Sequence, residues 1–499
     1  MLRRFRTTQN WTTIATVWAT FTTLMTIVSW IMRLAMLFIV PRNRKPSSAT
    51  GWLMLIFLFP WLGLPIFLLI GSPKLSRHRR EQQRTMDGNI ARAVEMVRQQ
   101  PELATLYDPP IPPRIAPFVR LNTNLGGMPA FGGNTVELLS AYDDVIRRIA
   151  ADIERAEKFV HVEYFTLSRD EETEAVFVAM ERAQQRGVTV RVLMDHLGSR
   201  KYPNFKHMRA RLEAAGIEYH LMLPLHLGRR MSRPDLRNHR KIVVIDGVTG
   251  YTGSQNLIKR TYFRKDAISY DELVARVRGP VAALLNAAFF TDWYSETGVR
   301  LGETVPETVV VPPALGDALC QVLPSGSGFE NENNLKLFTA LIHAAQQKLV
   351  ITNPYFVPDD ALFTAVASAA QRGVDVMLLN SQAADQFLVS HAQRSYYEEL
   401  LRAGVKIYWY NAPLLLHSKC MSIDDDIAVI GSSNLDMRSF QLNLEVTLIA
   451  YDPGVVACLR QIEATYLQKS SSLRLGEWET RLPRTKLAEN LARLSAALQ

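Results

Sequence analysis

Two long, almost uncharged stretches dominate the first seventy residues of the chain. From Trp11 to Val40, Arg33 is the single charged residue, and from Gly51 to Gly71 there is none. A helix needs roughly 20 apolar residues to cross the hydrocarbon core of a bilayer, so both stretches are long enough. We therefore predict an N-terminal hairpin of two transmembrane helices, over about residues 11–40 and 51–71.

The first stretch also has two other interpretations. A secretory signal peptide would have a shorter apolar region and a small-residue cleavage site, and the first stretch has neither. A single span plus an interfacial segment is the second alternative, because the first stretch is rich in threonine and contains Arg33. Pro60 and Pro65 fit a second membrane helix that is kinked there.

Lysine and arginine residues flank the two stretches unevenly. Three precede the first stretch, five closely follow the second, and three lie in the loop between them. Cytoplasmic segments of membrane proteins carry the excess of these residues. We therefore expect both ends of the hairpin, and everything after Gly71, to be cytoplasmic. In chain order the residues are Arg3, Arg4, Arg6, Arg42, Arg44, Lys45, Lys74, Arg77, Arg79, Arg80 and Arg84.

The rest of the chain repeats one pattern of alternating helices and strands. The segment AQQRGVTVRVLM in one half matches AAQRGVDVMLLN in the other, with glycines at equivalent places. Elements of this length indicate an α/β sandwich in each half, and two copies nearly two hundred residues apart indicate a pseudo-twofold arrangement. We expect strands at 159–165 and 188–195 around a helix at 171–186, and strands at 349–356 and 374–380 around a helix at 361–372.

This pattern predicts three domains. Residues 1–90 form the membrane anchor and a basic linker, residues 91–300 the first lobe, and residues 301–499 the second lobe.

Each half contains one copy of the motif H-x-K-x-x-x-x-D, followed by a small-residue turn and an asparagine. In a strand, residues two apart face the same side, so the His and Lys of each motif point together. The imidazole offers a nucleophile or proton carrier, and the ammonium offers charge to a phosphate. The turn allows close backbone approach, and the Asn offers an amide donor. The residues are His239, Lys241, Asp246, Ser254 and Asn256 in the first half, and His417, Lys419, Asp424, Ser432 and Asn434 in the second.

Two such halves meeting face to face would surround one phosphodiester. One imidazole could attack phosphorus while the other protonates the departing alkoxide. The lysines would neutralise charge, so we expect neither a metal ion nor another cofactor. The three cysteines, Cys320, Cys420 and Cys458, lack zinc-ligand spacing.

Composition narrows the range of partners. The formal net charge is +9 and hydrophobic residues make up 47% of the chain. Such a chain folds, and its charge suits a partner with phosphates, either anionic lipid or nucleic acid.

The motifs resemble the paired signature of the phospholipase D superfamily, and the chain is similar to bacterial cardiolipin synthases along almost its whole length. The similarity extends from RKPSSATGWLMLIFLFPWLGLPIFLLIG through LRNHRKIVVIDG, ITNPYFVPDDAL and LLHSKC to GSSNLDMRSFQLNLE. It implies phospholipase D-like α/β/α lobes and transfer of a phosphatidyl group between two phosphatidylglycerol molecules, which gives cardiolipin and glycerol. It also implies anionic phospholipids and the bilayer as partners, no nucleic acid, and a multi-pass location in the bacterial inner (plasma) membrane.

The resemblance also assigns roles. One histidine, His239 by resemblance, becomes a covalent phosphohistidine, and the other is the acid and base. Asp246 and Asp424 brace the fold. The carboxylate that orients His417 is expected to be Glu445, 28 positions further on, and the first half uses Glu272, with Asp271 as the alternative. Arg438 binds a phosphate or braces its loop, and these two roles stay open.

Three other functions compete with phosphatidyl transfer. Hydrolysis or headgroup exchange on other phospholipids uses the same residues. A nuclease fits the charge and the motif, but a membrane anchor gives it no advantage. A catalytically dead scaffold does not fit two intact motifs.

Overall fold

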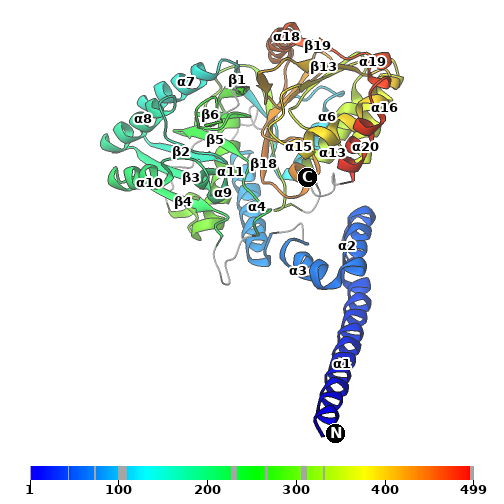
Figure 1. The fold of residues 1–499 in the computed structure, drawn as a ribbon. Coiled ribbons are helices and arrows are strands. Elements are labelled where there is room, and N and C mark those ends of the chain that lie inside the picture. The colour runs from blue at the N-terminus through cyan, green and yellow to red at the C-terminus, as the bar shows by residue number, and fades with distance from the viewer. Residues whose placement is uncertain are drawn as a thin grey trace. The chain divides into compact units, whose positions relative to one another are not determined.

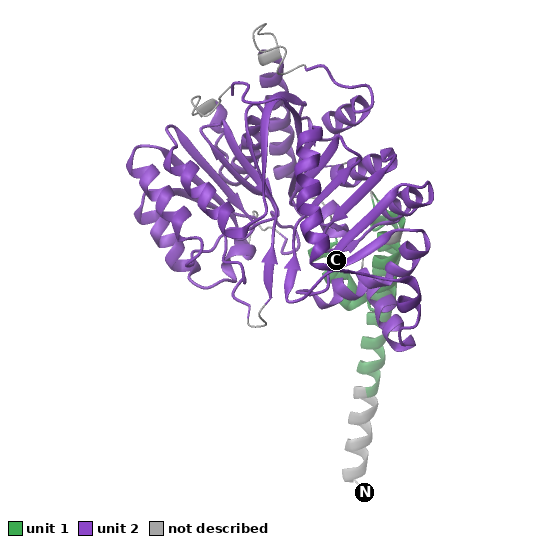
Figure 2. Cartoon of the chain, turned by 90° about the horizontal axis from the view of Figure 1, so that it is seen from above, with its two compact units in different colours: residues 1–73 green, residues 74–499 purple. Residues whose placement is uncertain are grey.

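The computed structural model of the chain describes residues 2–42, 44–71, 75–98, 109–225, 233–264, 268–304, 312–329 and 332–494. It divides into two compact units, residues 1–73 and residues 74–499, shown in green and purple in Figure 2.

In its described residues, the N-terminal unit forms α1 (Leu2–Ile39), α2 (Pro46–Leu58) and α3 (Pro60–Ile70). Within α1, Ala15–Ile39 is long and apolar enough to cross a membrane, judged by length and composition. The stretch predicted as one kinked helix over 51–71 is two short helices, because proline disfavours helical geometry in the residue before it and Phe59 leaves the helical region at φ −132° and ψ 69°. The second transmembrane helix is thus not present as a single helix.

Polar side chains of the N-terminal unit are satisfied within it. Arg33 donates to the Ser29 hydroxyl (2.7 Å) and to the Phe57 carbonyl (3.0 Å), which connects α1 to α2. Thr20 donates its hydroxyl to the carbonyl of Thr16 (2.8 Å), one helical turn back. These bonds give the hydroxyl and guanidinium groups of an apolar helix partners within the protein.

The second unit is built on one continuous sheet, which has 15 strands in the described residues. The first lobe contributes β1 (Phe131–Leu139), β2 (Phe159–Tyr164), β3 (Thr189–Asp195), β4 (Glu218–Met222), β5 (Lys241–Ile245), β6 (Thr249–Gly253) and β8 (Val274–Arg278). The second contributes β9 (Ala318–Ser325), β10 (Lys348–Thr352), β12 (Asp375–Ser381), β13 (Lys406–Tyr410), β15 (Cys420–Ile423), β16 (Ile427–Gly431), β18 (Glu445–Tyr451) and β19 (Ser470–Ser472).

The strand order repeats between the lobes. It runs β4-β3-β2-β5-β6-β8-β1 in the first lobe and β13-β12-β10-β15-β16-β18-β9 in the second, with β19 beside β13. In both, the first three strands are parallel and the next pairings are antiparallel. The lobes join where β1 pairs antiparallel with β9. The duplication predicted from the sequence thus has a counterpart in the topology.

The matched glycines have a conformational reason. Gly187 and Gly373 have φ of +91° and +93°, and each lies between a helix and the next parallel strand. Only glycine adopts this left-handed geometry without cost, so it ends both helices at equivalent points.

Helices cover both faces of the sheet (Figure 1). Val145, Phe177 and Met208 bring helices of the first lobe onto its outer face, and a second cluster does the same in the second lobe. A third cluster joins the lobes, with Leu285 and Leu459 packed against strands from both. In order the helices are α6 (Ala116–Gly126), α7 (Tyr142–Glu154), α8 (Glu174–Gln185), α9 (His196–Arg200), α10 (Phe205–Ala214), α11 (Val281–Thr297), α12 (Leu301–Thr304), α13 (Asn333–Ala344), α14 (Asp360–Gln371), α15 (Phe387–Ser395), α16 (Tyr397–Arg402), α17 (Met437–Gln441), α18 (Pro453–Gln468), α19 (Leu475–Glu479) and α20 (Pro483–Arg493).

The segment predicted as a basic linker is a helix of the second unit, α4 (Arg77–Arg98). Arg79 binds both carboxylate oxygens of Glu296 on α11 (2.6 and 2.9 Å), and Gln82 donates to the Tyr294 carbonyl (3.2 Å). The second compact unit therefore contains α4, and the predicted domain boundary at residue 90 falls within this helix. The division between the lobes at residues 300 and 301 stays a prediction.

Candidate active site

The two motif histidines are held by their main chains across the lobe boundary. The N–H of His239 donates to the Leu444 carbonyl (2.8 Å), and that of His417 donates to the Asp271 carbonyl (2.7 Å). The strand before His417, β14 (Leu414–Leu416), pairs in parallel with β7 (Ser269–Asp271) of the first lobe. His239 is thus fixed beside Leu444, the residue before Glu445. His417 is fixed beside Asp271, the residue before Glu272.

Those glutamates bind the imidazoles in a crossed arrangement. Nδ1 of His239 lies 3.0 Å from Oε2 of Glu445, and Nδ1 of His417 lies 2.8 Å from Oε1 of Glu272. The prediction that Glu445 orients His417 and Glu272 orients His239 is therefore wrong in its pairing, although both glutamates were named. Asp271 instead binds Arg260 and Tyr410.

The two motif serines hold these carboxylates rather than facing the cavity. Ser432 donates its hydroxyl to Oε2 of Glu445 (2.5 Å). Ser254 donates its hydroxyl to the Leu273 carbonyl (3.2 Å) and accepts the Leu273 N–H (2.9 Å), so it fixes the backbone next to Glu272. Serine, glutamate and histidine therefore form a short chain at His239, and both serines act by orientation.

Burial favours the neutral form of both imidazoles. It lowers the pKa of His239 to about 4, against the opposing effect of Glu445, and lowers the pKa of His417 against that of Glu272. A neutral imidazole that donates Nδ1–H to a carboxylate leaves the Nε2 lone pair free. Each histidine can therefore act as a nucleophile or a base.

The motif lysines are buried beside the histidines. Nζ of Lys241 donates to the His239 carbonyl (2.6 Å) and that of Lys419 to the His417 carbonyl (2.7 Å). Burial lowers their pKa to about 7 and about 8, although Glu445 and Glu272 oppose it. An arriving phosphate favours the protonated form, so both lysines would bind it as ammonium groups.

The motif asparagines differ in their surroundings. Oδ1 of Asn256 accepts the Thr166 N–H (3.1 Å), and its amide donates to the Tyr262 hydroxyl (3.1 Å). Oδ1 of Asn434 is buried without a hydrogen-bond partner among the described residues. Both line the cavity, and Asn434 has the more freely available polar atom.

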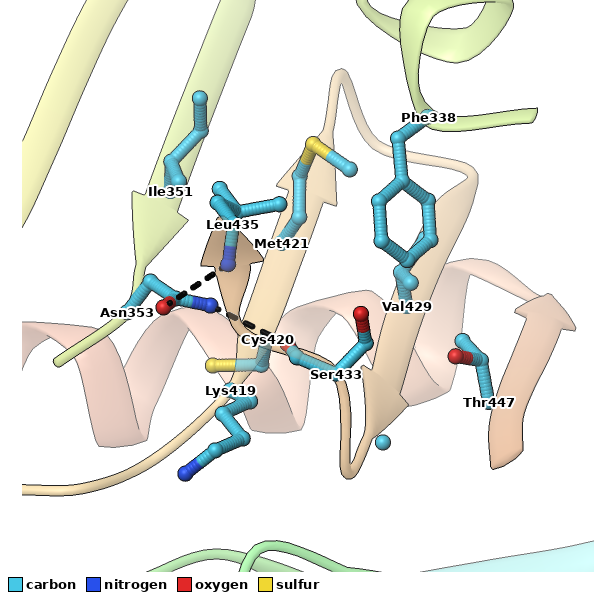
Figure 3. Close-up of a pocket in the computed structure, with 11 residues that line it drawn as sticks. Phe338, Ile351, Asn353, Lys419, Cys420, Met421, Val429, Ser433, Leu435 and Thr447 are labelled. Carbon is cyan, nitrogen blue, oxygen red and sulfur yellow. Dashed lines mark hydrogen bonds between the residues drawn. The ribbon is translucent and has the colours of Figure 1, made fainter. Parts of the chain in front are cut away.

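A small void is lined by Lys419 and by residues on either side of Asn434 (Figure 3). Asn353 donates to the Ser433 carbonyl (3.3 Å) and accepts the Leu435 N–H (3.3 Å), so it clamps the loop on both sides of Asn434. The void is about 20 Å³ and has room for a water molecule at most. It is a packing gap and not a substrate site.

The motif aspartates lie away from the reacting groups. Asp246 accepts the N–H groups of Glu157, Lys158 and Phe159 (2.9, 2.7 and 3.0 Å). Asp424 accepts those of Gln346, Gln347 and Lys348 at equivalent positions. Neither lines the cavity. They fix the turns that precede β2 and β10, the bracing role that the resemblance implied.

His239 and His417 open onto one cavity of about 710 Å³. Arg438 lines it and also donates to the Asp235 carbonyl (2.8 Å), so it both faces the cavity and braces the chain. Most of the other lining residues come from segments outside the two H-x-K-x-x-x-x-D motifs, so the motif spacing does not predict them. They are Phe165, Thr166, Lys201, Tyr202, Arg237, Tyr262, Arg264, Tyr270, Tyr355, Asp385, Gln386, Phe387, Leu388, Val389, Asp436 and Asn443.

Metal-ligand side chains do not gather at this site. Among the described residues, no group of three or more His, Cys, Asp or Glu side chains could hold a metal ion.

Comparisons with known proteins agree with this geometry. The family described as "Cardiolipin synthase, PLD-like domain" matches the chain twice, over residues 149–293 and 338–465. Proteins named cardiolipin synthase A from Yersinia pseudotuberculosis and Proteus mirabilis are each 33% identical to it. The first match covers 92% of this chain and 96% of the relative, and the second covers 93% and 95%.

A solved structure shares the fold. The phosphatidylserine synthase of Haemophilus influenzae superposes with a TM-score of 0.59 at 18% identity, over 76% of this chain and 98% of that one.

Proposed function

The chain belongs to the cardiolipin synthase family with phospholipase D-like domains, and on that premise we propose that it joins two phosphatidylglycerol molecules through a phosphohistidine. The enzyme is a phosphatidyltransferase and phospholipids are its substrates. The observation that carries the mechanism is the pair of crossed His–Glu contacts that open onto one cavity.

In the first step, Nε2 of His239 attacks the phosphorus of one phosphatidylglycerol. The P–N bond forms, the P–O bond to the headgroup glycerol breaks, and protonated His417 gives its Nε2 proton to the departing oxygen. In the second step, His417 takes the hydroxyl proton of a second phosphatidylglycerol. That oxygen attacks phosphorus, and the P–N bond breaks to release cardiolipin. Lys241 and Lys419 stabilise the charge that develops on the phosphoryl oxygens.

Electrostatics supports His239 as the nucleophile. Burial and both lysines, Lys241 and Lys419, lower the pKa of His239, while Glu445 raises it. For His417, burial and Lys419 lower the pKa, while Glu272 and Asp385 raise it. His417 is therefore the better proton carrier, and His239 the imidazole that stays neutral.

This assignment can be tested with a phosphatidyl donor whose leaving group departs without being protonated. With phosphatidyl-p-nitrophenol, His417→Ala should release a burst of p-nitrophenol equivalent to the enzyme and then stall. His239→Ala should give no burst. The opposite pattern would exchange the roles, and no burst in any variant would exclude a covalent intermediate.

We also propose that residues 1–73 anchor the protein in the plasma membrane, with α1 crossing it in one direction, the short helices α2 and α3 together returning, and the catalytic lobes in the cytoplasm. The apolar length of Ala15–Ile39, the internally satisfied Arg33 and the basic residues on both flanks support this topology. Activity on lipid in the bilayer, rather than on nucleic acid, follows from such an anchor.

Cys458 is an exposed native cysteine suited to testing the orientation, whereas Cys320 and Cys420 are buried. A membrane-impermeant maleimide should label Cys458 only after cells are permeabilised. In a Cys458→Ala background, Ser48→Cys in α2 should be labelled in intact cells. Labelling of Cys458 in intact cells would contradict cytoplasmic lobes.

A further inference from the structure

Two carboxylates line a cavity whose other described lining residues are cationic or neutral. The acidic residues among the described lining residues are Asp385 and Asp436. Asp436 is committed to capping α17, where it accepts the Ser439 N–H (2.7 Å). Asp385 precedes α15, and its carboxylate does not cap that helix. A negative charge in a phosphate-binding cavity weakens phosphate binding, so its presence calls for a different ligand group.

Two tyrosine hydroxyls fix the position of this carboxylate. Tyr355 donates to Oδ1 of Asp385 (2.5 Å), and Tyr270 donates to Oδ2 (3.2 Å). Both rings stand edge-on to the ring of His417, with centres 6.5 Å and 5.5 Å away. Asp385 therefore lies on the side of the cavity where, in the mechanism above, the alcohol gains or loses its proton.

Chemistry indicates what this cluster would bind. An ionised carboxylate has about four lone-pair sites and accepts hydrogen bonds only, and the two tyrosines occupy one site on each oxygen. The remaining sites suit a donor that carries no negative charge. A glycerol headgroup has two neighbouring hydroxyls, one to react and one to be recognised.

We propose that Asp385, positioned by Tyr270 and Tyr355, forms a subsite for alcohols with vicinal hydroxyls, and that it selects the glycerol moiety of donor and acceptor. This proposal rests on the phosphatidyl transfer proposed above. Asp385 is a specificity-determining residue in this account and takes no proton from the reacting oxygen.

Competition between two alcohols tests the subsite directly. The full-length chain is given phosphatidyl-p-nitrophenol with equimolar glycerol and ethanol, and the ratio of phosphatidylglycerol to phosphatidylethanol is measured. The unmodified chain should favour glycerol. Asp385→Asn should lower the ratio about tenfold, the effect of losing one charge-assisted hydrogen bond. Because both products form in the same tube, the ratio is independent of the amount of folded enzyme.

Tyr410→Phe is the matched control. Like Tyr355, Tyr410 donates its hydroxyl to an aspartate, in this case Asp271. Unlike Tyr355, it does not line the cavity. Its ratio should equal that of the unmodified chain. Tyr355→Phe, which loosens Asp385 without removing it, should lower the ratio by a smaller factor.

An unchanged ratio in Asp385→Asn would overturn the subsite, as would an equal fall in Tyr410→Phe. Failure of the unmodified chain to release p-nitrophenol with either alcohol would overturn the proposed transfer itself, and the subsite with it.

Discussion

At the scale of single residues, the crossed His–Glu contacts predict that the two glutamates serve different chemical steps. Glu445→Gln should slow the p-nitrophenol burst about 10- to 100-fold, because the amide supports His239 poorly. Glu272→Gln should leave that burst nearly intact and slow transfer to the alcohol, because it supports His417. Stopped-flow release of p-nitrophenol and product formation measure the two steps separately.

Glu463→Gln provides the control for these variants. Glu463 is a buried carboxylate that accepts from Ser422 (2.6 Å) and lies outside the cavity. It should leave both steps unchanged. Slowing of only the second step by Glu445→Gln would contradict the crossed assignment.

The pKa values of the site predict a bell-shaped pH dependence of kcat/KM. Activity should fall as the pH drops towards 4, because protonated His239 has lost its lone pair. It should also fall as the pH rises, first because His417, whose pKa burial holds below its usual value, loses the proton that it gives to the leaving group. It should fall further through about pH 7 to 8, because Lys241 and Lys419 lose the protons that bind phosphate. A profile that stays flat from pH 6 to pH 9 would contradict the role of the lysines.

The sequence predicted the motif residues but not their partners. His239 and His417 are recognisable because a fixed spacing recurs, and spacing reports local geometry such as the shared face of a strand. Glu445 lies 28 positions after His417, yet it binds His239, because the two lobes face each other. Asp385 precedes α15 and Tyr270 lies in β7, both outside the repeated motifs, so no pattern brought them together.

At the scale of secondary-structure elements, α4 is fastened to the first lobe by a nearly buried ion pair. The side chains of Arg79 and Glu296 are 14% and 5% exposed, and Glu296 also accepts the Leu223 N–H (3.0 Å). Glu296→Ala leaves both donors unsatisfied, so it should lower the free energy of unfolding by about 3 kcal/mol. Urea titration of the detergent-solubilised chain measures this.

Glu81→Ala removes an exposed ion pair on the same helix, with Arg77 88% and Glu81 57% exposed. It should change stability by less than about 0.5 kcal/mol. Equal effects of the two substitutions would mean that α4 is not held by the Arg79–Glu296 pair.

Most of the repeated elements were predictable within a few residues. The helix expected at 361–372 is α14 (Asp360–Gln371), and the strand expected at 374–380 is β12 (Asp375–Ser381). The strand expected at 349–356 ends at Thr352, because Pro354 interrupts it. Proline likewise divides the second apolar stretch at Pro60. Hydrophobic patterns show where an element is buried, whereas proline decides where it must end.

At the scale of the whole molecule, the catalytic unit has its own cores. Removing residues 1–73 should therefore leave a folded protein. Its activity should fall at least tenfold on liposomes, because the anchor raises the effective concentration of lipid. On short-chain phosphatidylglycerol in detergent it should stay within about threefold of the full chain. Equal activity on liposomes would contradict an anchoring role.

Each histidine is oriented by a glutamate of the opposite lobe, so the reaction needs both lobes in one folded unit. The measurement that tests this account most directly is the product ratio from labelled phosphatidylglycerol in liposomes. Cardiolipin and glycerol should form in equal amounts and exceed phosphatidic acid, and added glycerol should drive the reaction backwards. His239→Ala and His417→Ala should each abolish it. Phosphatidic acid as the main product, even at high lipid density, would make the protein a phospholipase and contradict the transfer mechanism.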